Sequence, residues 1–317
     1  MAQRTSLARK AGLLCLLLAA AWAAAGLQTS QEQAFAQGRT ILVTGAGGRT
    51  GSIVVEKLVR SGRYTVRALV HSEKSKDALL NSIEMLNPKN VMVADITSKE
   101  ALTKAFAGAS AVIVVTSAVP KLKPLSLIPF LLGKLLGKKW KLKFTWKGGK
   151  PEQVDWEGQK NQFDAADEAK VKQVILVGTM TGTQKDSFLN SIGDGDGDQI
   201  VMWKRKAEMY LIDKCQAGKM KYTIIHAGGL SDDDGGTAKV SVGVDDTLRE
   251  VKPSYRIPRA DVAEACVQAL ECKEALDRSF DLGSTDAGQP LTSPEDFKAI
   301  LATLEGKNCD YTINPPP

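Results

Sequence analysis

Aromatic residues, histidine and cysteine are all scarce in this chain of 317 residues. Phe, Trp and Tyr together make up 6% of it, and it has two histidines and five cysteines. Few aromatics and 28 glycines suit tight-turned α/β units better than a β-sandwich. Five cysteines at this length are no disulfide scaffold, and two histidines leave little room for a His-rich metal site. We therefore expect reduced cysteines and no bound metal.

Neither disorder nor a general surplus of positive charge characterises the chain. Hydrophobic residues make up 43% and charged residues 25% of it, close to the average of globular proteins. The formal net charge is +6, yet residues 121–150 hold nine lysines and no acidic residue. The remaining folded part is therefore mildly acidic and carries one basic insert. A nucleic-acid-binding protein should spread basic residues along a groove-facing element, so we expect no nucleic-acid partner.

The N-terminal segment has the pattern of a targeting signal. Basic residues near the start precede an uncharged, leucine-rich run over residues 11–27, which small residues follow. We expect a cleaved signal over residues 1–36 and a single domain over residues 37–317; an uncleaved membrane anchor is the alternative. The tripeptide AFA at 34–36 resembles the cleavage motif of proteins imported into complex algal plastids. We predict a plastid protein that travels by the secretory route, with the secretory pathway itself as the alternative.

Continuous apolar runs alternate with amphipathic stretches between residues 40 and 230. We expect strands at 40–44, 64–70, 91–94, 111–116, 174–178 and 222–227, and helices near 53–62, 98–107, 152–170 and 203–217. Apolar strands separated by amphipathic helices predict a doubly wound, Rossmann-like α/β fold with a parallel sheet. Past residue 230 the regularity weakens, with helices near 261–270 and 294–304 and a strand near 279–282. We assign this part to a small C-terminal cap on the substrate side.

A glycine-rich segment, TGAGGRTG at 44–51, follows the first strand and precedes the first helix. A dinucleotide pyrophosphate needs backbone N–H donors at a helix N-terminus and no Cβ in the way, and this strand–turn–helix context meets both needs. The residues that we expect to bind a cofactor here are Gly45, Gly47, Gly48, Arg49, Thr50 and Gly51.

The end of the second strand discriminates between the two nicotinamide cofactors. NAD sites place an acidic residue there, whereas NADP sites need positive charge for the 2′-phosphate. His71 holds this position, Arg49 lies in the glycine loop, and Glu73 is expected to point to solvent. The pattern favours NADP, with NAD as the alternative.

Several motifs, in order, resemble those of the atypical short-chain dehydrogenase/reductases. They are TGAGGRTG, VVTSAVP at 114–120, VDWEGQKNQFDAA at 154–166, WKRKAE at 203–208, HAGGL at 226–230 and IPRADVAEA at 257–265. Within that family the chain is most similar to the NmrA-like NAD(P)-binding proteins of plant and algal chloroplasts. The resemblance implies that the cofactor passes Asp95, Thr116, Ser117, Gly228 and Gly229, and that Lys206 holds the nicotinamide ribose.

The tyrosine that usually serves such enzymes is missing. Short-chain dehydrogenases place it four residues before the lysine, where it passes a proton to the substrate. Met202 holds that position relative to Lys206, and Thr179 supplies a hydroxyl near the usual serine position. Lys206 and Thr179 are thus expected in supporting roles, with Tyr210 or water as sources of a proton. His226 is either a cofactor contact or a structural histidine.

The basic insert at 121–150 also contains many apolar residues, including a leucine-rich stretch from 125 to 136 and two tryptophans. A long segment after the fourth strand is where a lid over the nicotinamide would lie. Apolar residues beside lysines also suit peripheral contact with an anionic membrane. A packed surface excursion is the third interpretation.

Two classes of function follow. The first is an NADPH-dependent reductase of a small acceptor such as a quinone, a flavin-like compound or an enone. The second is a non-catalytic NADP sensor or scaffold that acts through a partner or a membrane. The missing tyrosine favours the second class, and the intact glycine loop allows the first.

Overall fold

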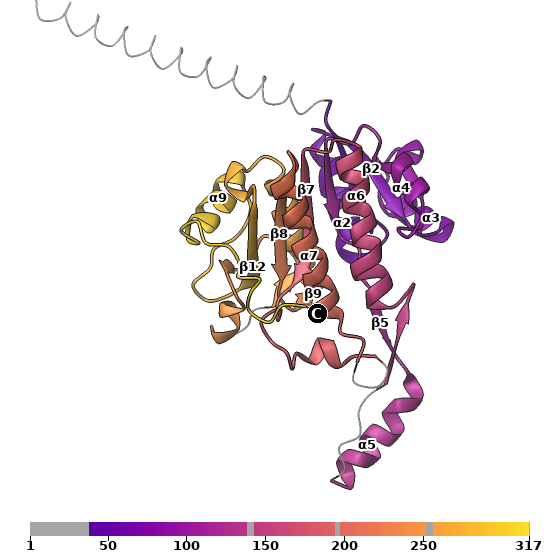
Figure 1. Ribbon diagram of the computed structural model, residues 1–317, viewed down its shortest axis with the longest axis vertical. Coiled ribbons are helices and arrows are strands. Elements are labelled where there is room, and N and C mark those ends of the chain that lie inside the picture. The colour runs from indigo at the N-terminus through magenta and orange to yellow at the C-terminus, as the bar shows by residue number, and fades with distance from the viewer. Residues whose placement is uncertain (1–37, 138–142, 194–196, 252–255, 317) are drawn as a thin grey trace, which may run out of the picture.

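A computed structural model describes residues 38–137, 143–193, 197–251 and 256–316 (Figure 1). The expected targeting segment at 1–36 lies outside these residues. The main sheet has the strand order β10-β12-β8-β7-β4-β1-β2-β3, and only β10 runs antiparallel to its neighbour. Its strands are β1 (Thr40–Thr44), β2 (Thr65–Val70), β3 (Val91–Val93), β4 (Ala111–Val114), β7 (Gln173–Thr179), β8 (Lys221–Ala227), β10 (Val240–Gly243) and β12 (Arg278–Ser284). The predicted Rossmann-like fold class is confirmed.

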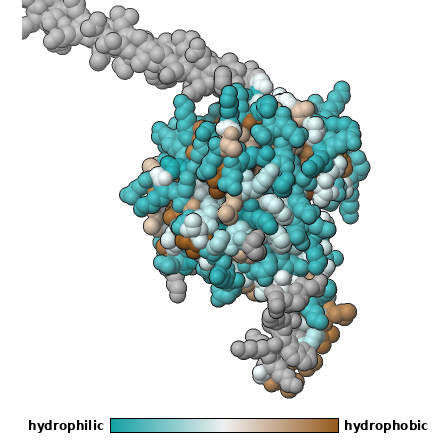
Figure 2. All heavy atoms as spheres, viewed as in Figure 1, coloured by the Kyte–Doolittle hydropathy of each residue, from teal (hydrophilic) through white to brown (hydrophobic). Residues whose placement is uncertain are grey.

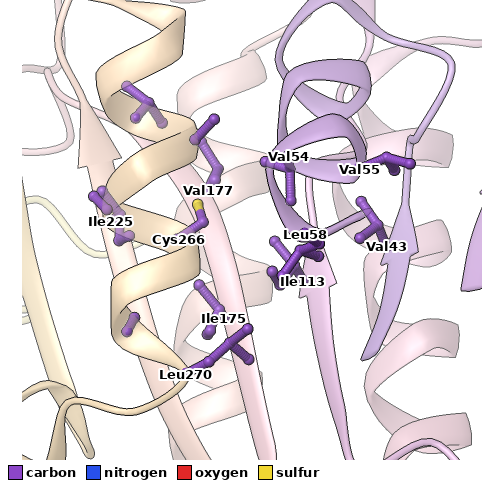
Figure 3. Packing of buried hydrophobic residues seen from close by; sticks show 14 of the residues in the cluster. Val43, Val54, Val55, Leu58, Ile113, Ile175, Val177, Ile225, Cys266 and Leu270 are labelled. Atoms are coloured by element: carbon purple, nitrogen blue, oxygen red, sulfur yellow. The ribbon is translucent and has the colours of Figure 1, made fainter. Parts of the chain in front are cut away.

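Helices cover both faces of this sheet. One face carries α2 (Arg49–Ser61), α3 (Glu73–Ser82), α8 (Arg259–Ala269) and α9 (Pro294–Ala302), and the other carries α4 (Lys99–Phe106), α6 (Gln159–Glu168) and α7 (Ile200–Ala217). Successive residues of one strand enter opposite cores: Ile41 and Val43 pack with the first group of helices, and Leu42 packs with the second. Burial on both sides explains why the strands are continuously apolar rather than alternating. Figure 3 shows α2 and α8 packed side by side on the first face.

The C-terminal part contributes more to the sheet than the sequence suggests. Strand β12 pairs in parallel with β8, and β10 pairs with β12, so both strands extend the main sheet. The short pair β9 (Leu230–Ser231) and β11 (Ile257–Pro258) lies outside it. The C-terminal cap is therefore smaller than predicted and consists of β9, β11 and the loops beside them.

A hairpin projects from the end of β4. Its strands, β5 (Val119–Leu122) and β6 (Phe144–Lys147), are antiparallel, and η2 (Pro124–Ser126) and α5 (Leu127–Leu135) follow β5. We call residues 119–137 and 143–147 the finger. Figure 1 shows α5 standing well away from the body, beyond the carboxyl ends of the parallel strands. Within the described part of the chain, no helix combines the length and apolarity needed to cross a bilayer.

Candidate functional site

The glycine loop between β1 and α2 is shaped so that a second molecule can approach its backbone. Gly45 has φ +70°, and a Cβ there would lie 2.8 Å from the carbonyl carbon of Val115. A Cβ on Gly51 would overlap the carbonyl oxygen of Gly45. Gly48 is the N-cap of α2 and provides no side-chain hydrogen bond to the first turn, which begins with Arg49 and the buried Thr50. The helix N-terminus therefore presents backbone donors and a positive dipole end to an anionic ligand.

A group of small polar side chains lies beside this loop, at the start of α3. Ser72 caps α3 by accepting a hydrogen bond from the Ser75 N–H, and Ser75 Oγ lies 3.3 Å from Nδ1 of His71. A Cβ on Gly47 would lie 3.1 Å from the Ser75 Cβ, so the loop and this group adjoin. The glycine loop and His71 were expected here, but Ser72 and Ser75 were not. A serine directly after a strand is the N-cap signal that would have indicated them.

Arg49 reaches across the carboxyl edge of the sheet rather than toward His71. Its Nη1 lies 3.1 Å from Asp232 Oδ2, and the other oxygen of Asp232 lies 2.6 Å from Arg259 Nη1. Arg49 and Asp232 are both largely exposed. Asp232 therefore links the glycine loop to the start of α8 through two ion pairs. The pair with Arg49 can open, because exposed ion pairs contribute little to stability.

A buried polar cluster adjoins the end of β4. Gln162 Nε2 donates to Thr116 Oγ1 at 3.1 Å, and Gln159 Nε2 donates to the Thr116 carbonyl oxygen at 3.1 Å. The carbonyl oxygens of both glutamine side chains are buried without a hydrogen-bond partner. Ser117, the next residue, donates its hydroxyl to the Ala118 carbonyl oxygen. Unsatisfied buried acceptors mark this cluster as a place for a further donor.

An ion pair lies at the centre of this cluster. Asp155 belongs to the π-helical segment η3 (Glu152–Gly158), a geometry that is frequent at functional sites. Its Oδ1 lies 2.7 Å from the Nζ of buried Lys204, and its Oδ2 accepts the Ala118 N–H at 3.0 Å. Burial raises the pKa of Asp155, and the Lys204 ammonium opposes that rise. This pair connects α7 to the polypeptide that leaves β4.

The two lysines of the WKRKAE motif lie in different surroundings. Lys206 Nζ lies 5.1 Å from the ring centroid of Trp156 and 5.2 Å from that of Trp203, in cation–π contacts. Lys204, two residues earlier, is the lysine that reaches the polar cluster. The two lysines, two residues apart on the helix, do not share a face, so only Lys204 lies beside Asp155.

Ile200 stands four residues before Lys204, as Met202 stands four residues before Lys206. Ile200 is buried with Ala118 and Val201 in a small apolar cluster, and it cannot transfer a proton. Met202 contacts the C-terminal segment, where its Sδ accepts from Asn314 Nδ2 at 3.7 Å. The hydroxyl of Tyr210 donates to Asp164 Oδ1 at 2.6 Å, so that tyrosine is committed to a contact with α6.

The other expected residues lie along the same carboxyl edge. Thr179 is half-buried at the end of β7, in register with Ala227. Gly228 donates its N–H to Leu282, and the Gly229 carbonyl accepts from Ile257. Asp95 is exposed after β3 and accepts two hydrogen bonds from Thr97. These residues all lie at or just after the carboxyl ends of β3, β7 and β8. That edge is where open parallel sheets bind their ligands.

Behind this edge, His226 forms a buried network that the sequence did not indicate. Its Nε2 lies 3.1 Å from Glu208 Oε2, and its Nδ1 lies 3.3 Å from Asp281 Oδ1. Cys309 Sγ lies 3.5 Å from Nδ1, and the Tyr311 hydroxyl lies 3.3 Å from Nε2. Burial opposes the charge on His226, but Glu208 above all outweighs it and holds the pKa of His226 well above its ordinary value. His226 thus joins β8 to the C-terminal segment through its hydrogen bonds.

Part of this network has the spacing of metal ligands. His226, Asp281 and Cys309 each place one donor atom within 4.8 Å of the other two. The sequence predicted no metal site, because it has only two histidines and no zinc-binding pattern. Each of the three already has a hydrogen-bond partner within the network.

The chain is similar to known proteins in sequence and in fold. The family model described as NAD(P)H-binding matches residues 45–273. An uncharacterized chloroplastic protein of Arabidopsis thaliana is 45% identical over 270 residues, which cover 84% of this chain and 76% of the relative. The sanguinarine reductase of Eschscholzia californica is 41% identical over 278 residues, covering 84% of this chain and 96% of that protein. A short-chain dehydrogenase/reductase from Veillonella parvula, solved with NADP, has a TM-score of 0.54 at 14% identity over 80% of this chain and 99% of that one, a likeness of fold.

Proposed function

This chain belongs to the NAD(P)H-binding family, and from that premise we propose that it is an NADPH-dependent reductase of a small conjugated acceptor. The acceptor class that we propose comprises quinones, flavin-like compounds and enones. The observation that carries the proposal is the buried Lys204–Asp155 pair beside Thr116, combined with an apolar Ile200 where a proton donor would stand. The 41% identical relative is itself named a reductase.

The glycine loop fits a nicotinamide dinucleotide. Gly45 and Gly51 leave no room for a Cβ, and the N-terminus of α2 is not capped by a side chain. The residues at the end of β2 support NADP rather than NAD: His71, Ser72 and Ser75 offer hydrogen-bond donors, and the side chain of Glu73 beside them is exposed. Arg49, once released from Asp232, supplies the positive charge that a 2′-phosphate requires.

When bound, the cofactor supplies the hydride. The residues of this chain position the cofactor. Lys204, held by Asp155, is proposed to donate to the ribose hydroxyls, and Thr116, Ser117 and Thr179 are proposed to lie along the bound cofactor. This assigns to Lys204 the role that the motif suggested for Lys206.

Proton delivery decides the class of acceptor. Reduction of a simple ketone requires a proton at the oxygen as the hydride arrives, and Ile200 and Met202 have none to give. A reduced quinone or flavin-like product is stable as an anion, so its proton can come from water afterwards. The site is therefore suited to acceptors that need no concerted protonation.

A non-catalytic NADP sensor is the second candidate, and the same apolar Ile200 favours it. A single experiment separates the two. NADPH oxidation is followed at saturating cofactor with a quinone, a flavin and an aliphatic ketone, and NADPH binding is measured in parallel by calorimetry. Turnover of a quinone or flavin supports the reductase, whereas tight binding without turnover of any acceptor supports the sensor.

We propose a plastid location, on the strength of the chloroplastic relative and the AFA tripeptide at 34–36. A fluorescent protein fused after residue 60 tests whether the N-terminal residues direct import, and a cytosolic signal would reject the proposal.

A further inference from the structure

The finger exposes apolar side chains that a protein normally buries. Leu125 is 84% exposed, Ile128 63%, Leu131 61% and Leu136 65%. Ile128, Leu131 and Leu132 follow the i, i+3, i+4 spacing and therefore share one face of α5. Figure 2 shows the apolar surface gathered at the far end of the finger, away from the largely hydrophilic body. Contiguous exposed apolar surface of this kind marks an interaction site.

The base of the finger is fixed to the body, so the projecting tip is part of the fold. Trp146 donates its Nε1–H to Asp198 Oδ2 at 2.6 Å and packs against the buried cluster of Ala118, Ile200 and Val201. The two arms of the hairpin are tied by Ser126, whose hydroxyl oxygen accepts the Lys143 N–H at 3.1 Å. The apolar face of α5 is thus held in solvent.

Lysines flank the apolar face of α5, and their positive charge indicates an anionic partner. Lys121, Lys123, Lys143 and Lys147 are exposed along the arms, and the sequence from 121 to 150 contains no acidic residue. A short helix with an apolar face, flanked by lysines and too short to span a bilayer, suits the interface of an anionic membrane. On such a surface the lysines of the arms would face the headgroups and the apolar tip the acyl boundary.

We propose that the finger docks this protein on an anionic lipid surface. A lid over the cofactor would have to lie across the carboxyl ends of the strands, whereas α5 points away from them (Figure 1). A second copy of this chain would need acidic groups opposite the lysines, and the finger has none to offer in a symmetric contact. The proposal does not depend on catalytic activity.

The test is flotation of the full chain with vesicles of phosphatidylcholine alone and with 30% phosphatidylglycerol. Binding should need the anionic lipid and fall as salt rises, because a surface attraction is screened over about 10 Å at 0.1 M salt. Replacing Lys121, Lys123 and Lys147 by Gln should lower the partition coefficient on the order of tenfold to hundredfold. The matched control replaces Lys89, Lys172 and Lys219, which are exposed at the opposite edge of the sheet.

A second measurement separates the finger from any contribution of the N-terminal residues. An environment-sensitive fluorophore on Leu131→Cys should shift to the blue with anionic vesicles, while the same dye on Met85→Cys, also exposed, should not. Ile128→Glu combined with Leu132→Glu should abolish the difference. Absence of the shift at 131, or equal flotation of the two lysine triple variants, overturns the proposal. If the unmodified chain is a dimer and the variant with Ile128→Glu and Leu132→Glu is a monomer, the apolar face binds a second copy of the chain, and the proposal is wrong.

Discussion

Lys204 Nζ lies 2.7 Å from Asp155 Oδ1, and both side chains are almost fully buried. The pair joins α7 to the π-helical segment that precedes α6, and Asp155 in turn holds the backbone that leaves β4. One buried charge pair therefore positions the three chain segments around the proposed nicotinamide site.

Removing one partner of this pair should be far more harmful than removing the neighbouring lysine. Lys204→Met leaves a buried carboxylate unpaired and should lower the free energy of unfolding by about 3–5 kcal/mol. Lys206→Met, which loses only cation–π contacts, should cost about 1 kcal/mol or less. Urea unfolding measures both. The double variant Lys204→Met, Asp155→Asn should recover most of the stability but not NADPH affinity; full recovery of affinity would contradict the ribose role of Lys204.

Cofactor preference should depend on Arg49. The unmodified chain should bind NADPH more tightly than NADH, and Arg49→Ala should weaken NADPH binding roughly 10- to 150-fold, the equivalent of about 1.5–3 kcal/mol for a charged hydrogen bond. Calorimetry gives both affinities. Arg60→Ala, on the same helix and equally exposed, is the control and should change neither. Equal affinity of the unmodified chain for the two cofactors would exclude the NADP assignment.

Acceptor preference should follow from the missing proton donor. General acid catalysis contributes about 10²- to 10⁴-fold, so aliphatic ketones should be reduced slowly even at saturating NADPH, whereas quinones should suffer less. Ile200→Tyr should raise ketone reduction relative to quinone reduction, and Met202→Tyr should not. Steady-state rates with matched ketone and quinone substrates test this. Rapid turnover of a simple ketone by the unmodified chain would reveal another donor.

Stability should fall in the alkaline range because of His226. Its pKa is raised in the folded state, so the stabilisation is fully present below about pH 6.5, the unfolded value, and is lost as pH rises toward the folded value. The slope should not exceed about 1.4 kcal/mol per pH unit. Glu208, Asp281, Cys309 and Tyr311 all face the imidazole and set the upper end of the range.

Urea unfolding between pH 6 and 10 measures this slope. His226→Gln should flatten it, while His71→Gln, at the exposed second histidine, should leave it unchanged. An identical slope in His226→Gln would assign the pH dependence to other groups.

The sequence predicted the strands of the parallel sheet because most of them, such as β1 and β4, are apolar on both faces, as burial on both sides requires. It missed α3, whose residues bury only Leu79, and β10, an edge strand of four residues. Neither segment carries enough periodicity to be distinguished from a loop.

The strand–turn–helix geometry of the glycine loop was predicted because its requirement is local: a strand, a tight turn and a helix N-terminus follow one another in the chain. Lys204 and Asp155 were not paired, because which face of α7 meets η3 depends on packing between segments about fifty residues apart. The same holds for His226 and Cys309, which only the completed sheet brings together.

The His226 network also bears on how this domain is made. Tyr311, which closes the network, lies 85 residues after His226 in the chain. Arg205 donates to the carbonyl oxygens of Asp310 and Ile313, so the same late residues also cover α7. His226 and Arg205 therefore gain these partners only once residues 309–313 are in place, wherever the chain folds, so residues up to the end of β8 cannot complete this part of the core alone.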